Sequence, residues 1–82
     1  MEIEEQIARE IQKIFTTLSK QKNYNCGTHG SLKTNYDEKS GLYHNKVNAT
    51  FSNDEEIDNF QIIIVTNKDQ TQIVNSYSIA VE

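Results

Sequence analysis

The sequence has few of the features that indicate an exported or membrane-bound protein. Its only cysteine is Cys26, so no disulfide bond can form within the chain. No apolar leader follows Met1, and no apolar run is long enough to span a bilayer. These absences favour a reducing compartment, so we expect a cytoplasmic protein that has no membrane as a partner.

Motifs for catalysis, nucleotide binding and metal binding are absent, as are internal repeats, linkers and low-complexity tracts. Cys26 and His29 are spaced like two zinc ligands, and His44 is a potential third. A structural zinc site needs four ligands, and the chain has no second cysteine. A nucleophilic Cys–His pair needs basic neighbours, but the nearest bases are Lys22 and Lys33. We therefore expect no metal ion and no other cofactor.

The length of 82 residues predicts a single domain that covers residues 1–82. A domain of this size buries only roughly 60–65% of its unfolded surface, so its stability is marginal unless a second chain covers more apolar area. The hydrophobic fraction is only 35%, yet four tyrosines and three phenylalanines stand among branched aliphatic residues. This pattern favours a folded domain over a disordered chain.

The first 22 residues predict one amphipathic helix. Its apolar residues recur mostly at intervals of three and four and line a single face, namely Ile3, Ile7, Ile11, Ile14, Phe15 and Leu18. Acidic residues come early in this segment and lysines come late, which suits the helix dipole. We expect the helix to end within residues 21–23, because Asn23, Asn25 and Gly27 favour turn conformations.

From Ser31 onward the pattern is typical of strands. We predict a weak strand over residues 28–36, a hairpin connection at 37–41, and an alternating strand at 43–51 in which Asn45 is the polar exception. Residues 60–65 are apolar on both faces, as in a central strand. Residues 72–81 fit either a strand or a helix, and their branched and hydroxyl side chains favour the strand.

Together these segments predict an α+β fold, in which the N-terminal helix packs on an antiparallel meander sheet of three to four strands. In this two-layer sandwich the helix would cover Val47, Phe51, Ile62 and Ile64. One helix covers only one face of a sheet, so Ile63 and Val65 would point to the other face. There we expect a covering loop, a partner or a second copy of the chain.

The net charge of −4 lies wholly in the strand region, because residues 1–22 contain four acidic and four basic residues. Four carboxylates fall within five residues, at Asp54, Glu55, Glu56 and Asp58. They lack the residue order of a calcium loop. We expect either an ordinary solvated loop or a negative surface that attracts a protein with a basic surface.

The segment Gly-Thr-His-Gly-Ser, which directly follows the predicted helix, resembles small RNA-cleaving toxins built as a helix and a three-stranded sheet. The resemblance covers residues 28–31 and implies that His29 acts as a general acid–base. RNA binding needs a basic face, however, and the strand region is acidic. It also lacks exposed aromatic pairs that would stack bases, so the sequence argues against nucleic acid as a partner.

The leading functional hypothesis is a small, acidic, intracellular protein-binding module that is not an enzyme. An inhibitor, an immunity factor or an anti-defence factor would fit, and the abundance of Ile and Asn with a single arginine suggests a bacterial or phage origin. The candidate partner-binding residues are Asp54, Glu55, Glu56, Asp58, Ile63 and Val65. The alternatives are the RNA-cleaving domain that uses His29 and a structural homodimer formed through the sheet.

Overall fold

The N-terminal segment forms the helix that the spacing of its isoleucines predicts. In the computed structural model, which describes residues 2–81, α1 spans Ile3–Ser19. The helix ends slightly before the predicted boundary at residues 21–23. The amides of Lys20 and Gln21 donate to carbonyl oxygens three residues back, at 3.2 and 3.1 Å, and these bonds tighten and close the last turn. Among residues 2–81, no helix combines the length and apolar character needed to cross a membrane.

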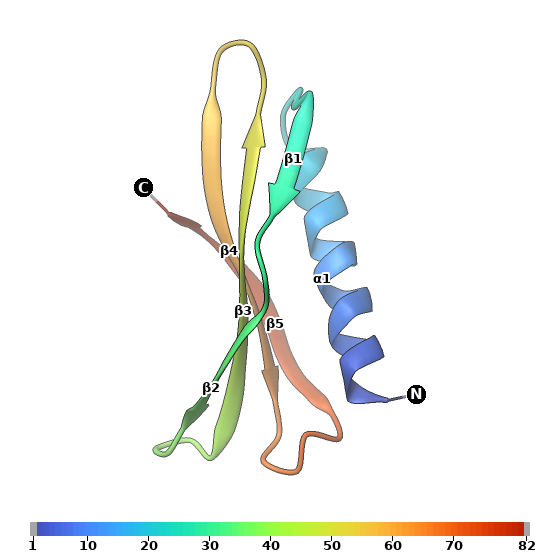
Figure 1. The fold of residues 1–82 in the computed structure, drawn as a ribbon, viewed down its shortest axis with the longest axis vertical. Helices are drawn as coiled ribbons and strands as arrows, with labels where there is room; N and C mark the ends of the chain where they lie inside the picture. Colours follow the sequence, from blue (N-terminus) through green and yellow to red (C-terminus); the bar gives the residue numbers. More distant parts are fainter. Residues whose placement is uncertain (1, 82) are drawn as a thin grey trace.

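Five strands follow the helix and form one antiparallel sheet (Figure 1). They are β1 (Cys26–His29), β2 (Lys33–Asp37), β3 (Leu42–Ser52), β4 (Ile57–Thr66) and β5 (Ile73–Val81). The strand order is β1-β3-β4-β5, and β2 also pairs with β3. The α+β class and the antiparallel meander are thus confirmed, and the ambiguous C-terminal segment is a strand.

The strand count exceeds the predicted three to four because the predicted first strand is broken. β1 pairs with the second half of β3 and β2 pairs with its first half, so both lie along the same side of β3. Residues 30–32 between them belong to neither strand. The two pieces therefore act as one interrupted edge strand, and β5 forms the opposite edge of the sheet.

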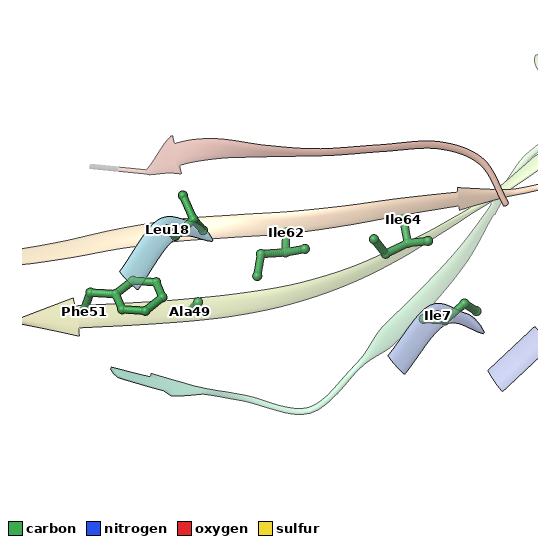
Figure 2. Packing of buried hydrophobic residues seen from close by; sticks show 6 residues of the cluster. All are labelled: Ile7, Leu18, Ala49, Phe51, Ile62 and Ile64. Atoms are coloured by element: carbon green, nitrogen blue, oxygen red, sulfur yellow. The ribbon is translucent and has the colours of Figure 1, made fainter. Parts of the chain in front are cut away.

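The helix packs on one face of the sheet, and the hydrophobic core lies between the two layers. Figure 2 shows the buried side chains of this core, namely Ile7 and Leu18 of α1, Ala49 and Phe51 of β3, and Ile62 and Ile64 of β4. Phe51 is fully buried, and its ring centroid lies 4.7 Å from that of Phe15, 5.3 Å from Tyr24 and 5.9 Å from Phe60. The predicted contact between the helix and this face is confirmed.

Asn45, the polar exception on the apolar face of β3, is only 2% exposed. Its Nδ2 donates to the Ile64 carbonyl oxygen at 2.9 Å and to Thr66 Oγ1 at 3.3 Å. Its Oδ1 accepts a hydrogen bond from Thr34 Oγ1 at 2.8 Å. The buried amide therefore connects β3 with both of its neighbours, β2 and β4.

Candidate functional site

The acidic cluster lies where the chain turns from β3 into β4. Asn53 holds this turn, because its Oδ1 accepts the amide hydrogens of Glu55 and Glu56, each at 2.8 Å. The backbone N–H of Asn53 donates to the Glu56 carbonyl oxygen at 3.0 Å. The hydrogen bonds of Asn53, rather than the carboxylates of the acidic cluster, therefore hold the shape of this loop.

Two of the four predicted carboxylates are bound within the molecule. Lys22 Nζ lies 2.8 Å from Glu56 Oε2 and 3.2 Å from Asp58 Oδ2. The Tyr24 hydroxyl donates to the same Asp58 oxygen at 2.6 Å. We call Lys22, Tyr24, Glu56 and Asp58 the hairpin clasp. It joins the segment after α1 to the β3–β4 hairpin.

The clasp also changes the acidity of its members. Hydrogen bonds from Tyr24 and then from Lys22 lower the pKa of the Asp58 carboxyl below its ordinary value. The Asp58 hydrogen bond raises the pKa of the Tyr24 hydroxyl. Hydrogen bonds to Glu56 and Asp58 raise the pKa of Lys22. These shifts favour the paired ionic form near neutral pH.

The other half of the acidic cluster has no bonding partner within the described part of the molecule. Within residues 2–81, the side chains of Asp54 and Glu55 form no ion pair and no hydrogen bond. Both line a polar cleft of about 520 Å³ beside the hairpin clasp. A basic surface would therefore meet two free carboxylates here and two that already pair with Lys22.

His29 lies at the end of β1 and faces the helix. Its ring packs edge-on against Phe15 with a centroid distance of 5.5 Å, and its Nδ1 lies 3.1 Å from the Gly30 carbonyl oxygen. With Ile7, Leu32 and other residues it lines a mostly apolar groove of about 330 Å³. In the described part of the chain, no hydrogen bond joins the imidazole to a carboxylate. General acid–base catalysis by His29 thus stays a prediction, and the described residues place no second acid–base group in a hydrogen bond with the imidazole.

The residues considered for zinc do not converge. Cys26 is exposed, and the alternation along β1 places it on the opposite face from His29. His44 pairs with Asn35 at the other end of the sheet, far along β3 from Ser52, which is the partner of Cys26. Within residues 2–81, no three His, Cys, Asp or Glu side chains gather into a group that could hold a metal ion.

Ile63 and Val65 lie on the sheet face opposite α1, as the alternation along β4 predicts, but they are not exposed. Ile63 is 3% and Val65 5% exposed. The register places Ile63 between Lys46 and Tyr77 on the neighbouring strands. On a central strand, flanking side chains of this size shield the shorter aliphatic ones. Ile63 and Val65 thus expose little apolar area of their own, and their contact with a partner stays a prediction.

Exposed apolar residues of this face lie on β5, and one more, Ile57, lies at the start of β4. Among residues 2–81, seven large hydrophobic residues are exposed, and four of them belong to β5, namely Val74, Tyr77, Ile79 and Val81. Tyr77 pairs with Ile63 and Ile79 pairs with Gln61, so both side chains lie on the face away from α1, and Val81 follows by alternation. Among the strands that the structure describes, β5 pairs with β4 alone. We call the open edge of β5, with Tyr77, Ile79 and Val81, the β5 surface.

The sequence does contain a signal for the β5 surface. Apolar residues alternate at positions 77, 79 and 81, and no charged residue occurs between Ile73 and Val81. An uncharged strand is typical of the middle of a sheet, whereas this one lies at an edge. Comparison of the chain with family models, with curated proteins and with solved structures found no match.

Proposed function

We propose that this protein is a protein-binding module that binds through the β5 surface. One observation carries the proposal: β5 is a nine-residue edge strand that exposes four large apolar side chains and has no charged residue. An edge strand presents unpaired backbone N–H and C=O groups that a further strand can satisfy. Binding is therefore by strand addition, in which the backbone supplies the hydrogen bonds and the side chains supply the specificity.

The side chains of the β5 surface add a hydrophobic contribution to this backbone pairing. Tyr77, Ile79 and Val81 are 39%, 45% and 44% exposed, so each retains apolar area that a partner can cover. Complete burial of such a side chain is worth about 1.5–3 kcal/mol relative to leaving it in water, and a partial burial contributes part of that. Contiguous exposed apolar residues are typical of interaction sites.

The proposal does not depend on the acidic cluster or on His29. Glu56 and Asp58 are engaged with Lys22, and the imidazole of His29 packs against Phe15. The roles of inhibitor, immunity factor or anti-defence factor are compatible with a module of this kind. They remain part of the proposal, to be decided by the identity of the strand that is bound.

The test compares two lysine substitutions at equally exposed apolar residues. Ile79 on β5 and Leu32 beside the interrupted edge are both 45% exposed. A tagged chain is produced in cells together with an untagged copy, so that both a second copy and an unrelated protein can be recovered. We expect the wild type and Leu32→Lys to retain a bound chain and Ile79→Lys to lose it. Equal recovery with Ile79→Lys contradicts the proposal.

A further inference from the structure

We propose that the strand added to β5 is the β5 strand of a second copy of this chain, so that two sheets join across a twofold axis. This inference rests on the proposed function, because it names the occupant of the same surface. Two identical edge strands can pair antiparallel about an axis perpendicular to the sheet. The helices of both copies would then lie on the same face of one continuous sheet.

The side chains of β5 match their own copy when the axis passes through Ile79. In that register Ile79 lies opposite Ile79 of the second copy, and Tyr77 lies opposite Val81 of the second copy. These residues are two positions apart along the strand, so all of them lie on the face away from α1. Cross-strand aromatic and β-branched pairs are among the stabilising ones. Both copies together would form one continuous apolar stripe.

The other face of β5 also tolerates this register. Ser78 lies opposite Ala80 of the second copy, and both side chains are small. Ser78 pairs with Ile62 and Ala80 pairs with Phe60, so this face continues the layer beneath α1. On this face, the pairs formed between residues 77 and 81 of the two copies therefore bring neither a bulky side chain nor a charge into contact.

Charge favours a second copy over a basic partner at this edge. β5 has no charged residue, so two copies can approach here although each has a net charge of −4. The acidic residue that shares a shallow pocket with Val81 is Asp58, which is already paired with Lys22. An incoming strand also needs apolar residues at two-residue spacing without charges, and β5 itself has this pattern.

The first experiment measures the mass of the purified chain by light scattering over a range of concentrations. We expect the mass of two chains for the wild type and for Leu32→Lys. For Ile79→Lys we expect one chain and a dissociation constant at least tenfold higher, because like charges directly opposite one another destabilise a strand pair. Circular dichroism checks that the exposed substitution leaves the fold intact.

The second experiment tests the register by disulfide trapping in a Cys26→Ser background, which removes the exposed native thiol. Ile79→Cys should form a disulfide-linked dimer under mild oxidation. Tyr77→Cys should not, because its copy lies four residues away along the strand, roughly 14 Å, beyond the roughly 7 Å limit between Cα atoms for a disulfide. Trapping through Tyr77→Cys and not through Ile79→Cys would overturn the proposed pairing.

The two proposals fail in different ways. A chain that stays a monomer at every concentration overturns self-association, and if it still captures another protein that Ile79→Lys loses, the binding module stands. A dimer that is unaffected by Ile79→Lys overturns the proposed pairing. If the capture of every other protein is equally unaffected by that substitution, the binding function of the β5 surface fails as well.

Discussion

The two edges of the sheet are built in opposite ways. One edge consists of β1 and β2, of four and five residues, which are separated by residues 30–32. It carries charges at Lys33 and Asp37. The other edge is β5, nine residues long and uncharged. Both edges flank the same central pair of strands, β3 and β4.

This difference shows how a small sheet can direct where it pairs. Short edge strands, interruptions and charged side chains all hinder the addition of a further strand, and the β1–β2 edge has all three. The β5 edge has none of these three features, and its one irregularity is a bulge near its start. On the proposed function, a further strand would therefore add at one side of the molecule, without any need for a groove or a charged site.

The largest expected effect comes from the core that both edges share. Phe51→Ala should destabilise the protein by about 3–5 kcal/mol, because a fully buried ring in contact with Phe15, Tyr24 and Phe60 is lost. Urea unfolding measures the change. Ile57→Ala, at a residue that is 72% exposed, is the control and should shift stability by less than about 0.5 kcal/mol. Similar losses in both variants would contradict the position of the core.

The next effect tests how closely β1 approaches the core. A Cβ added at Gly27 would lie 2.9 Å from two ring carbons of Phe51 and 3.0 Å from one of Phe15. Because Phe51 has no room to move, Gly27→Ala should cost about 1–3 kcal/mol. Gly30→Ala is the matched control, since a Cβ there meets no atom within 4 Å. If both variants unfold at the same urea concentration, β1 does not lie against the core as described.

A smaller effect is the loss of folding stability at acidic pH, which depends on Asp58 of the hairpin clasp. The pKa of Asp58 is lowered in the folded state, so its stabilisation is present above the ordinary value of 3.8 and is lost as the pH falls through the lowered one. Lys22 does not oppose this, because its raised pKa acts only at alkaline pH. Tyr24→Phe keeps the ring on Phe51 but removes the hydrogen bond to Asp58.

The measurement for this prediction is the melting temperature of both proteins between pH 6 and pH 3. The wild type should lose more stability than Tyr24→Phe over this interval. Asp37 also has a lowered pKa, because Ser40 and the Lys39 amide donate to it, but that contribution is the same in both proteins. Parallel losses would mean that the Tyr24 hydrogen bond does not stabilise ionised Asp58.

The smallest effect is expected at the free half of the acidic cluster. The double variant Asp54→Asn, Glu55→Gln should change stability by less than about 0.5 kcal/mol, because neither side chain has a partner within residues 2–81. It should also leave the mass in solution unchanged, since neither residue belongs to β5. The pair Glu56→Gln, Asp58→Asn is the comparison, and thermal melting should show the larger loss there.

The sequence predicted the local part of this structure well. The helix follows from the spacing of its isoleucines, and the strand character of residues 73–81 follows from their branched and hydroxyl side chains. The burial of Phe51, Ile62 and Ile64 follows from alternation. All these patterns are repeated within a few residues, so a single strand or helix expresses them fully.

The remaining features depend on residues that are distant in the sequence. Lys22 meets Glu56 and Asp58 across 34 and 36 positions, so the acidic cluster could not be divided into bound and free halves beforehand. The burial of Ile63 depends on the side chains that flank it on β3 and β5. The exposure of β5 depends on its place at the edge of the sheet, which strand order alone decides.

The buried side chain of Asn45 has a consequence for the register in which the strands pair. Its amide is satisfied only when Thr34 lies on one side and Ile64 and Thr66 on the other. If either neighbouring strand shifted by one position, the buried Asn45 amide would lose hydrogen-bond partners, at a cost of about 1–3 kcal/mol. The same shift would turn every apolar residue of the shifted strand to the wrong face of the sheet. The correct register is therefore favoured over a shifted one, and one side chain helps to align three adjacent strands.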